Sequence, residues 1–209
     1  MVKIYYCDVS KLNIENDMQE ISQYRREKLS KTKRILNKRQ GLGAELLLNW
    51  AVKENMANAP FPLDIKTGPY GKPYCDALPF RFSLSHSGDF SACAICDREI
   101  GLDIQQLSEY KENLVRRSFT AQEREYVQAS DDKDMAFTKI WSMKESFIKA
   151  LGTGLHTSLD SFSVMPDFIV NINNSGRYCI HSDFKENCFF SVCVKGGSVS
   201  APEITKLEL

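Results

Sequence analysis

The sequence has no excess of charge of either sign. Its 209 residues contain 27 Lys and Arg against 27 Asp and Glu, so the formal net charge is zero. Binding of nucleic acid without sequence preference depends on a positive field around the protein, and this balance excludes such a field for the chain as a whole. We therefore expect no nucleic-acid partner.

Long apolar runs and paired cysteines are also missing. No uninterrupted apolar segment approaches the ~18 residues of a membrane span, and the start, MVKIYYCDVS, lacks the basic and apolar regions of a secretory signal. The seven cysteines are an odd number, and their spacing matches neither a zinc ribbon nor a disulfide framework. These absences favour a cytoplasmic protein with reduced thiols and no membrane contact.

What is present is an ordinary globular composition with a mixed pattern of helices and strands. A strand is expected from Lys3 to Val9 and a long helix from Arg39 to Met56. The next segment, NAPFPLDIKTGPYGKPYCDALP, holds five of the seven prolines and is predicted to be a loop. RFSLSHS, SACAIC and IGLDIQ then alternate as short strands, which we expect to form a β-meander.

The second half repeats this order. A helical pattern runs from Asn113 to Gln128, and an amphipathic one from Met135 to Leu151 ends at Gly152. Three or four strands follow, read from SLDSFSV, DFIVNI, RYCIHS and CFFSVCV. We therefore predict an α+β fold of two similar halves, residues 1–100 and 101–209.

A lysine interrupts the apolar stripe of the second long helix. Lys144 lies one turn from both Ile140 and Ile148, where its charge requires an anion or its stem must extend along the edge of the core. The neighbouring Glu145 precedes Lys149 by four residues, which an ordinary ion pair on a helix surface also explains. The helix alone is therefore a weak signal of a site.

The strand IGLDIQ places two polar residues, Asp103 and Gln105, on the face opposite its apolar residues. A buried acid is costly unless it is paired, so Asp103 requires a cation, several donors or a metal ion. Together with Glu145 it could supply two carboxylates to Mg²⁺, which commonly keeps waters and takes phosphate oxygens as further ligands. An Asp held by backbone or Arg contacts is the structural alternative.

Basic residues are concentrated between Arg25 and Arg39. This segment contains eight Lys and Arg residues and one acidic residue, Glu27. This is either a phosphate-sized positive field or a solvated helix face. Lys72 in YGKP and His86 in SHS add two donors at loop or strand-end positions, where binding residues concentrate, although a single histidine is more often structural.

Taken together, GKPYCDALPFRFSLSHS, IGLDIQ and WSMKESFIKALGTGL resemble the three ordered motifs of 4′-phosphopantetheinyl transferases of the surfactin-synthetase-activating type. The resemblance is dense from Tyr70 to Val164. It implies a pseudo-twofold arrangement of the halves, with coenzyme A bound in the cleft between them. It also implies Mg²⁺-dependent transfer of the phosphopantetheine arm from coenzyme A to a serine of an apo acyl or peptidyl carrier protein, with release of adenosine 3′,5′-bisphosphate.

The resemblance also implies roles for individual residues. Asp103 and Glu145 correspond to the metal ligands, with Gln105 at a third position that is usually acidic. Glu123, in FTAQE, corresponds to the candidate general base, with Lys149 and His86 as further catalytic residues. The implied contacts to coenzyme A are Arg25, Lys28, Arg39, Gln40, Gly71, Lys72, Pro73, Ser85, His86, Lys144 and Lys149.

Two other classes of function compete with this interpretation. An inactive module that binds coenzyme A or a carrier protein has some support from the neutral Gln105 at a usually acidic position. The joint presence of Asp103, Glu145, Lys149 and Glu123 argues against it. A metal-dependent phosphoesterase would need more metal-binding side chains than the three histidines and these carboxylates provide. The internal pseudo-dimer favours a monomer.

Overall fold

The structure is a computed structural model that describes residues 1–165, 169–172, 176–196, 198 and 200–209. In chain order its helices and strands are β1 (Lys3–Asp8), α1 (Ile14–Asp17), α2 (Gln23–Ser30), α3 (Ile35–Asn55), β2 (Lys66–Thr67), β3 (Pro73–Tyr74), β4 (Arg81–Ser87), β5 (Phe90–Cys96), β6 (Ile100–Gln106), α4 (Glu112–Ser118), α5 (Ala121–Ala129), α6 (Lys133–Leu151), β7 (Ile169–Ile172), β8 (Gly176–Lys185), β9 (Cys188–Lys195) and β10 (Glu203–Lys206). Two short 3₁₀ turns, Gly154–His156 and Leu159–Ser161, follow α6.

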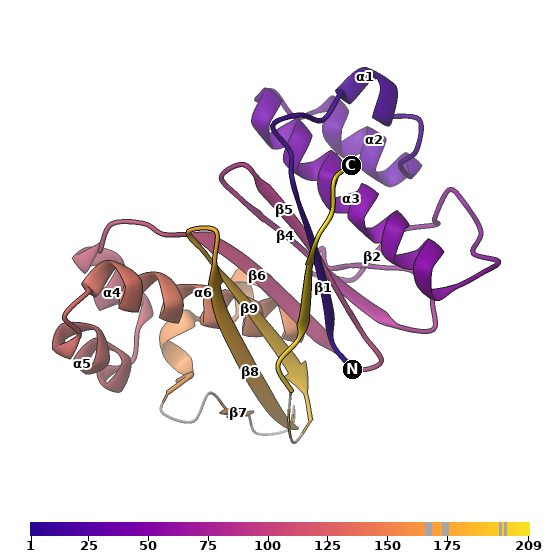
Figure 1. Ribbon diagram of the computed structural model, residues 1–209. Coiled ribbons are helices and arrows are strands. Elements are labelled where there is room, and N and C mark those ends of the chain that lie inside the picture. Colours follow the sequence, from indigo (N-terminus) through magenta and orange to yellow (C-terminus); the bar gives the residue numbers. More distant parts are fainter. Residues whose placement is uncertain (166–168, 173–175, 197, 199) are drawn as a thin grey trace.

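Two four-stranded sheets form the centre of the molecule. The first has the strand order β10-β1-β5-β4 and the second has the order β6-β9-β8-β7. All neighbouring strands are antiparallel except β1 and β10, which are parallel. In Figure 1 the last strand runs beside β1, so the end of the chain returns to the sheet in which the chain began.

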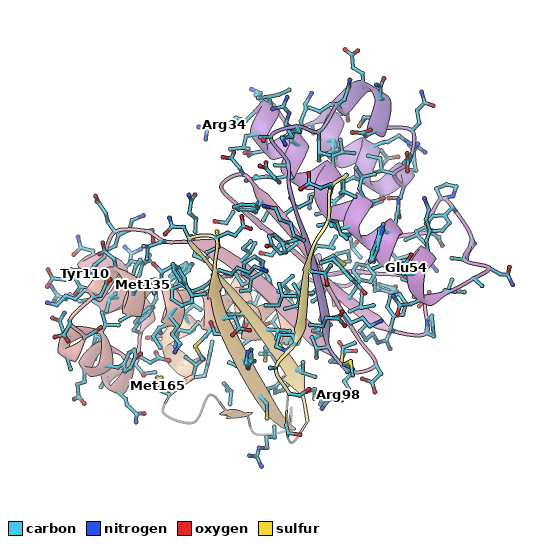
Figure 2. The ribbon with its side chains drawn as sticks, in the orientation of Figure 1. Arg34, Glu54, Arg98, Tyr110, Met135 and Met165 are labelled. Carbon is cyan, nitrogen blue, oxygen red and sulfur yellow. The ribbon has the colours of Figure 1, made fainter. Side chains whose placement is uncertain are left out.

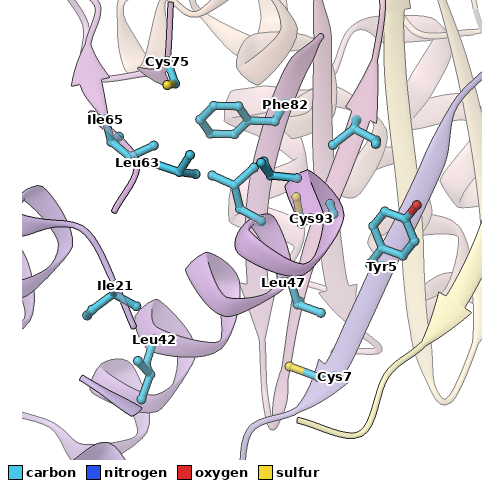
Figure 3. Close-up of a cluster of buried hydrophobic side chains, with 14 of the residues drawn as sticks. Tyr5, Cys7, Ile21, Leu42, Leu47, Leu63, Ile65, Cys75, Phe82 and Cys93 are labelled. Atoms are coloured by element: carbon cyan, nitrogen blue, oxygen red, sulfur yellow. The ribbon is translucent and has the colours of Figure 1, made fainter. Parts of the chain in front are cut away.

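The sheets pack face to face, and one long helix covers the outer face of each. Alternation along β1 sends Tyr5 and Cys7 towards α3, and Ile4 and Tyr6 towards the second sheet. Figure 3 shows the first of these cores, to which α3 contributes Leu42 and Leu47 and the first sheet contributes Tyr5, Cys7 and Cys93. A third core joins α6 to β8 and β9. The α+β prediction is confirmed, with two four-stranded sheets and one long helix packed against each, although β10 of the C-terminal segment joins the first sheet.

The contact between β6 and α6 is unusually close. A Cβ atom on Gly101 would lie 2.0 Å from the backbone oxygen of Ser146 and 2.2 Å from the backbone nitrogen of Ala150. Only glycine allows the helix to approach the strand this closely. This contact brings the faces that carry Asp103 and Glu145 together.

Three details of the predicted elements are wrong. The strand β6 does not continue the hairpin of β4 and β5, since it pairs with β9 in the second sheet. The segment SLDSFSV contains the 3₁₀ turn Leu159–Ser161 rather than a strand, and the predicted helix from Asn113 to Gln128 is two helices, α4 and α5. The first two residues of DFIVNI lie outside the described part of the chain.

The long helices were predicted well. The structure has α3 at Ile35–Asn55 and α6 at Lys133–Leu151, and Gly152 ends α6 in the left-handed conformation, with φ of 73°. None of the helices formed by the described residues is long and apolar enough to cross a membrane.

Candidate active site

Asp103 is buried where β6 meets both β4 and α6. It is 6% exposed. Its Oδ1 accepts hydrogen bonds from Lys149 Nζ at 2.7 Å and from Ser85 Oγ at 3.1 Å. Its Oδ2 is also buried, and no described group lies within hydrogen-bonding distance of it. A buried carboxylate oxygen without a partner is costly, so this atom marks a position that a ligand can fill.

Glu145 lies on α6, on the side that faces Asp103. Burial and the negative charge of Asp103 raise the pKa of the Glu145 carboxyl, while Lys149 opposes the shift. Because Glu145 and Lys149 are four residues apart, they share one face of the helix. Two neighbouring carboxylates that disfavour each other's charge are stabilised by a cation between them.

The residues at this position fit Mg²⁺. The ion commonly takes one or two carboxylates and completes its six oxygen ligands with waters and substrate phosphates. Asp103 and Glu145 supply two carboxylates, and Gln105, half-buried on β6, lies on the same face of the strand as Asp103. Within the described ranges, no group of three or more His, Cys, Asp or Glu side chains converges, so a metal cage made by the protein alone is not formed there.

A cavity of about 280 Å³ adjoins these groups. Its walls come from both halves of the chain: the loop 70–73, residues 82–84 of β4, and the α6 end with Glu145, Lys149 and Gly152. The predicted ligand residues Gly71 and Pro73 line it. A ligand in this cavity would contact both halves at once.

His86 adds an imidazole at the β4 edge of the site. Desolvation and the positive charges of Lys149 and Arg25 lower its pKa, and the charge of Asp103 opposes them. Because the ring is desolvated and cations surround it, its neutral form is favoured at pH 7. The negative charge of a phosphate bound beside these cations would oppose the shift.

An ion pair with Glu45, which was not among the predicted site residues, holds Arg25 in position. Its Nε donates to Glu45 Oε2 at 3.0 Å, and both side chains are buried. Glu45 also accepts the backbone N–H of Ser22, which caps α2. An acid inside the apolar stretch AELLLNW was the signal in the sequence, because a buried Glu almost always has a partner.

The other predicted residues of the basic segment differ in their contacts. The buried Nε of Arg39 has no hydrogen-bond partner among the described residues, which suits an anion site. Gln40 is already engaged, since its Nε2 donates to Gly88 O at 2.8 Å. Lys28 is exposed, and Arg34 extends from the start of α3 away from the ribbon in Figure 2.

Two predicted ligand side chains are occupied by protein partners instead. Lys72 Nζ donates to Ile100 O at 3.0 Å and to Ala150 O at 3.1 Å, so it joins the 70–73 loop to β6 and α6. The hydroxyl of Ser85 donates to Asp103 and accepts from Lys149 Nζ and from Ile104 N. Since a hydroxyl has one proton and two lone pairs, Ser85 has no capacity left for a phosphate.

The roles expected for Glu123 and Lys144 are corrected by the structure. Both side chains are fully buried, and Lys144 Nζ donates to the two carboxylate oxygens of Glu123 at 2.8 and 2.6 Å. The same oxygens accept the backbone N–H groups of Thr120 and Val164. Neither side chain is exposed, so in this structure Glu123 and Lys144 bind each other rather than a ligand. Lys144 has its anion, but that anion is Glu123.

The sequence was also compared with known proteins. Residues 99–200 match the model of the 4′-phosphopantetheinyl transferase superfamily. A 4′-phosphopantetheinyl transferase of Bacillus subtilis is 35% identical over 170 residues, covering 78% of this chain and 73% of the relative. The transferase Sfp of Bacillus subtilis strain 168 is 34% identical, covering 78% and 76%, and the transferase gsp of Aneurinibacillus migulanus is 31% identical, covering 67% and 62%.

These relatives share most of their length with this chain. The family match begins at Glu99, immediately before β6, and includes all of α6. The chain therefore belongs to the 4′-phosphopantetheinyl transferase superfamily and is an enzyme of that kind, a phosphopantetheinyl transferase.

Proposed function

We propose that phosphopantetheinyl transfer takes place beside Asp103 and Glu145 and depends on Mg²⁺. In this reaction coenzyme A gives its 4′-phosphopantetheine arm to a serine of an apo acyl or peptidyl carrier protein and leaves as adenosine 3′,5′-bisphosphate. The observation that carries the assignment is the unpartnered, buried Oδ2 of Asp103, close to Glu145 and next to a cavity lined by both halves.

The reaction requires that the serine and the diphosphate of coenzyme A are positioned, and that the charge on the diphosphate is neutralised. The serine hydroxyl loses its proton to water as its oxygen forms a bond to the phosphorus that carries the arm. The bond from that phosphorus to the bridging oxygen breaks, and its electron pair leaves on adenosine 3′,5′-bisphosphate. When bound, Mg²⁺ would neutralise charge on the diphosphate. Asp103 and Glu145 would hold it directly, and Gln105 through water or not at all, because a neutral amide is a weaker ligand for a hard cation. Lys149, whose side chain is partly exposed, would orient the diphosphate.

The positive cluster at the edge of β4 would hold the remaining phosphate of coenzyme A. His86 and Arg25 lie close enough for the charge of Arg25 to lower the pKa of His86. Lys28 also contributes to that shift, and Arg39 has a buried donor to offer. The adenine would occupy the part of the cavity beside Gly71 and Pro73, where Lys72 shapes the wall without touching the ligand.

The cellular setting is part of the proposal. All seven cysteines are free and buried thiols, which supports a reducing cytoplasm. We assign residues 1–100 and 101–209 to the two halves that form the cleft, with β10 crossing back to the first sheet. Since each chain would supply both walls of its own cleft, a monomer is sufficient for activity.

The test is the intact mass of an apo carrier protein after incubation with the enzyme, coenzyme A and Mg²⁺. The proposal predicts that the carrier gains one phosphopantetheine, and that Asp103→Ala and Glu145→Ala lose this activity while remaining folded. A panel of acyl and peptidyl carriers would identify the preferred substrate.

Two outcomes separate the proposal from its alternatives. Binding of coenzyme A without any mass gain on the whole panel would support an inactive binding module. Full activity in excess chelator, or in either carboxylate variant, would contradict the metal site while leaving the transferase activity intact.

A further inference from the structure

Three serines on β4 satisfy backbone N–H groups of β6. Ser83 Oγ accepts the N–H of Leu102 at 2.9 Å, and Ser85 Oγ accepts that of Ile104 at 3.1 Å. Ser87 Oγ accepts the N–H of Gln106 at 3.0 Å. Each pair is separated by 19 positions in the chain, so the contact is a regular ladder between side chains of one strand and the backbone of another.

This ladder lies at one side of the packed sheets, where an edge strand of the first sheet meets an edge strand of the second. The strand β4 is the last strand of the first sheet, and β6 is the first strand of the second. A strand at the edge of a sheet has a row of N–H groups that its neighbour does not use, and a buried unpaired N–H is costly. Here hydroxyl groups take the place of a backbone partner, so the sheets are joined without merging into one.

The ladder also fixes the register between the strands. Because side chains alternate along a strand, residues 83, 85 and 87 point to the same side and match every second N–H of β6. A shift by one residue would leave all three hydroxyls without a backbone N–H donor from β6. The register therefore places Asp103 between Leu102 and Ile104, the residues whose N–H groups bond to Ser83 and Ser85. There Asp103 lies opposite Ser85 and near His86.

We propose that Ser83 and Ser87 are positioning residues for the transfer reaction. They hold β6 at the distance and register from β4 at which the Asp103 carboxylate faces the cations of β4 and α6. Ser85 shares this task and in addition orients Asp103 itself. The inference rests on the proposed role of Asp103, but the ladder can be tested without it.

Ser87 gives the most direct test, because Gln106 is exposed and its N–H donates to the Ser87 hydroxyl. Amide hydrogen exchange measured by NMR should show slow exchange of the Gln106 amide in the parent protein. Ser87→Ala should accelerate exchange at Gln106 about tenfold or more, as expected for one lost hydrogen bond. Ser87→Thr, which keeps the hydroxyl, should retain the protection.

A matched control is available in the second sheet. Ser182 lies on β8 and its hydroxyl contacts Ser191 Oγ at 2.8 Å, within one sheet. Ser182→Ala should leave the amides of Leu102, Ile104 and Gln106 unchanged. Equal exchange at Gln106 in Ser87→Ala and the parent protein would overturn the ladder, whatever the enzyme's activity.

The functional part is tested with the double variant Ser83→Ala/Ser87→Ala. We expect kcat to fall about tenfold or more and the Mg²⁺ concentration for half-maximal rate to rise, in protein that still unfolds cooperatively. The corresponding double threonine variant should recover most of both losses. A purely structural role would lower the amount of folded enzyme but leave the Mg²⁺ requirement of the folded fraction unchanged, and that result would overturn the positioning role.

Failure of this inference can be distinguished from failure of the metal site. If Asp103→Ala abolishes transfer while the double serine variant behaves like the parent, the site stands and the positioning role is wrong. If Asp103→Ala is fully active, the metal assignment is wrong, and the exchange measurement alone decides whether the ladder exists.

Discussion

Lys144 and Glu123 form an ion pair inside the second half, where neither side chain reaches water. Burial lowers the pKa of Lys144, and the charge of Glu123 opposes that shift. Removing one partner leaves the other charge buried and unpaired. Glu123→Gln and Lys144→Met should therefore each destabilise the protein by about 3–5 kcal/mol, measured by urea unfolding.

The double variant Glu123→Gln/Lys144→Met provides the control for this prediction. With both charges removed, its loss of stability should be clearly smaller than the sum of the two single losses. A Glu123→Gln protein of normal stability that has lost only kcat would contradict the structural role and return Glu123 to the position of general base.

Gln105 occupies the face of β6 that carries Asp103, but with a neutral amide. Because Mg²⁺ prefers carboxylate oxygen, Gln105→Glu should lower the Mg²⁺ concentration needed for half-maximal activity. The measurement is a rate titration with Mg²⁺ at saturating coenzyme A. An unchanged or higher requirement would place Gln105 outside the metal site.

His86 is surrounded by Lys149, Arg25 and Lys28, with Asp103 as the opposing charge. Its pKa is lowered in the free protein, and a bound phosphate would raise it. The protonated ring then adds to binding at low pH, and this contribution is lost as pH rises through the pKa of the complex. His86→Ala should raise KM for coenzyme A, by a larger factor at a pH of about 6 than at about 8. A fall in kcat at unchanged KM would instead identify His86 as the acceptor of the serine proton.

At the scale of the elements, the close contact of β6 with α6 sets the distance between the two carboxylates. A methyl group at Gly101 would meet backbone atoms of Ser146 and Ala150, which cannot rotate away. Gly101→Ala should displace α6, destabilise the protein by about 1–3 kcal/mol and weaken Mg²⁺ binding.

Gly68→Ala is the matched control for Gly101→Ala. A Cβ at Gly68 would meet only Lys72 O, at the ordinary contact distance of 3.7 Å. The free energy of unfolding in urea and the affinity for Mg²⁺ should both be close to those of the parent protein in Gly68→Ala. Equal behaviour of the two variants would show that the helix can give way without disturbing the site.

The same elements show what a sequence can reveal about a fold. The helices α3 and α6 were predicted because their apolar residues repeat at helical spacing over many turns. The strand β6 was recognised as a strand, but its partner was not, because alternation gives the faces of a strand and not its neighbours. Its N–H groups bond to serine hydroxyls of β4, and no local pattern distinguishes such serines from solvent-exposed ones.

At the scale of the molecule, the site depends on segments far apart in the sequence. Asp103 pairs with Lys149, and the charges of both residues act on Glu145. The contacts of Glu123, Lys144, Lys72 and Ser85 could not be predicted, because a motif shows that a residue type is required and not which atom it touches. A residue that pairs inside the protein and a residue that binds a ligand look the same in a sequence. Only the three-dimensional structure distinguishes the two roles.

The proposed site also gives a physical reason for a cation requirement. Asp103, on β6, and Glu145, on α6, add negative charge next to a cavity that would receive the diphosphate of coenzyme A. Without a bound cation these charges repel the ligand, and with one they attract it. Mg²⁺ and coenzyme A should therefore strengthen each other's binding through these two carboxylates.

Calorimetric titration of coenzyme A, with and without Mg²⁺, tests this claim most directly. Wild-type protein is compared with Asp103→Asn and Glu145→Gln, and with Glu54→Gln as a control, since Glu54 is exposed at the far end of α3 (Figure 2). Mg²⁺ should strengthen coenzyme A binding in wild type and Glu54→Gln and have little effect in the other two variants. The same gain from Mg²⁺ in all four proteins would contradict a metal site at Asp103 and Glu145.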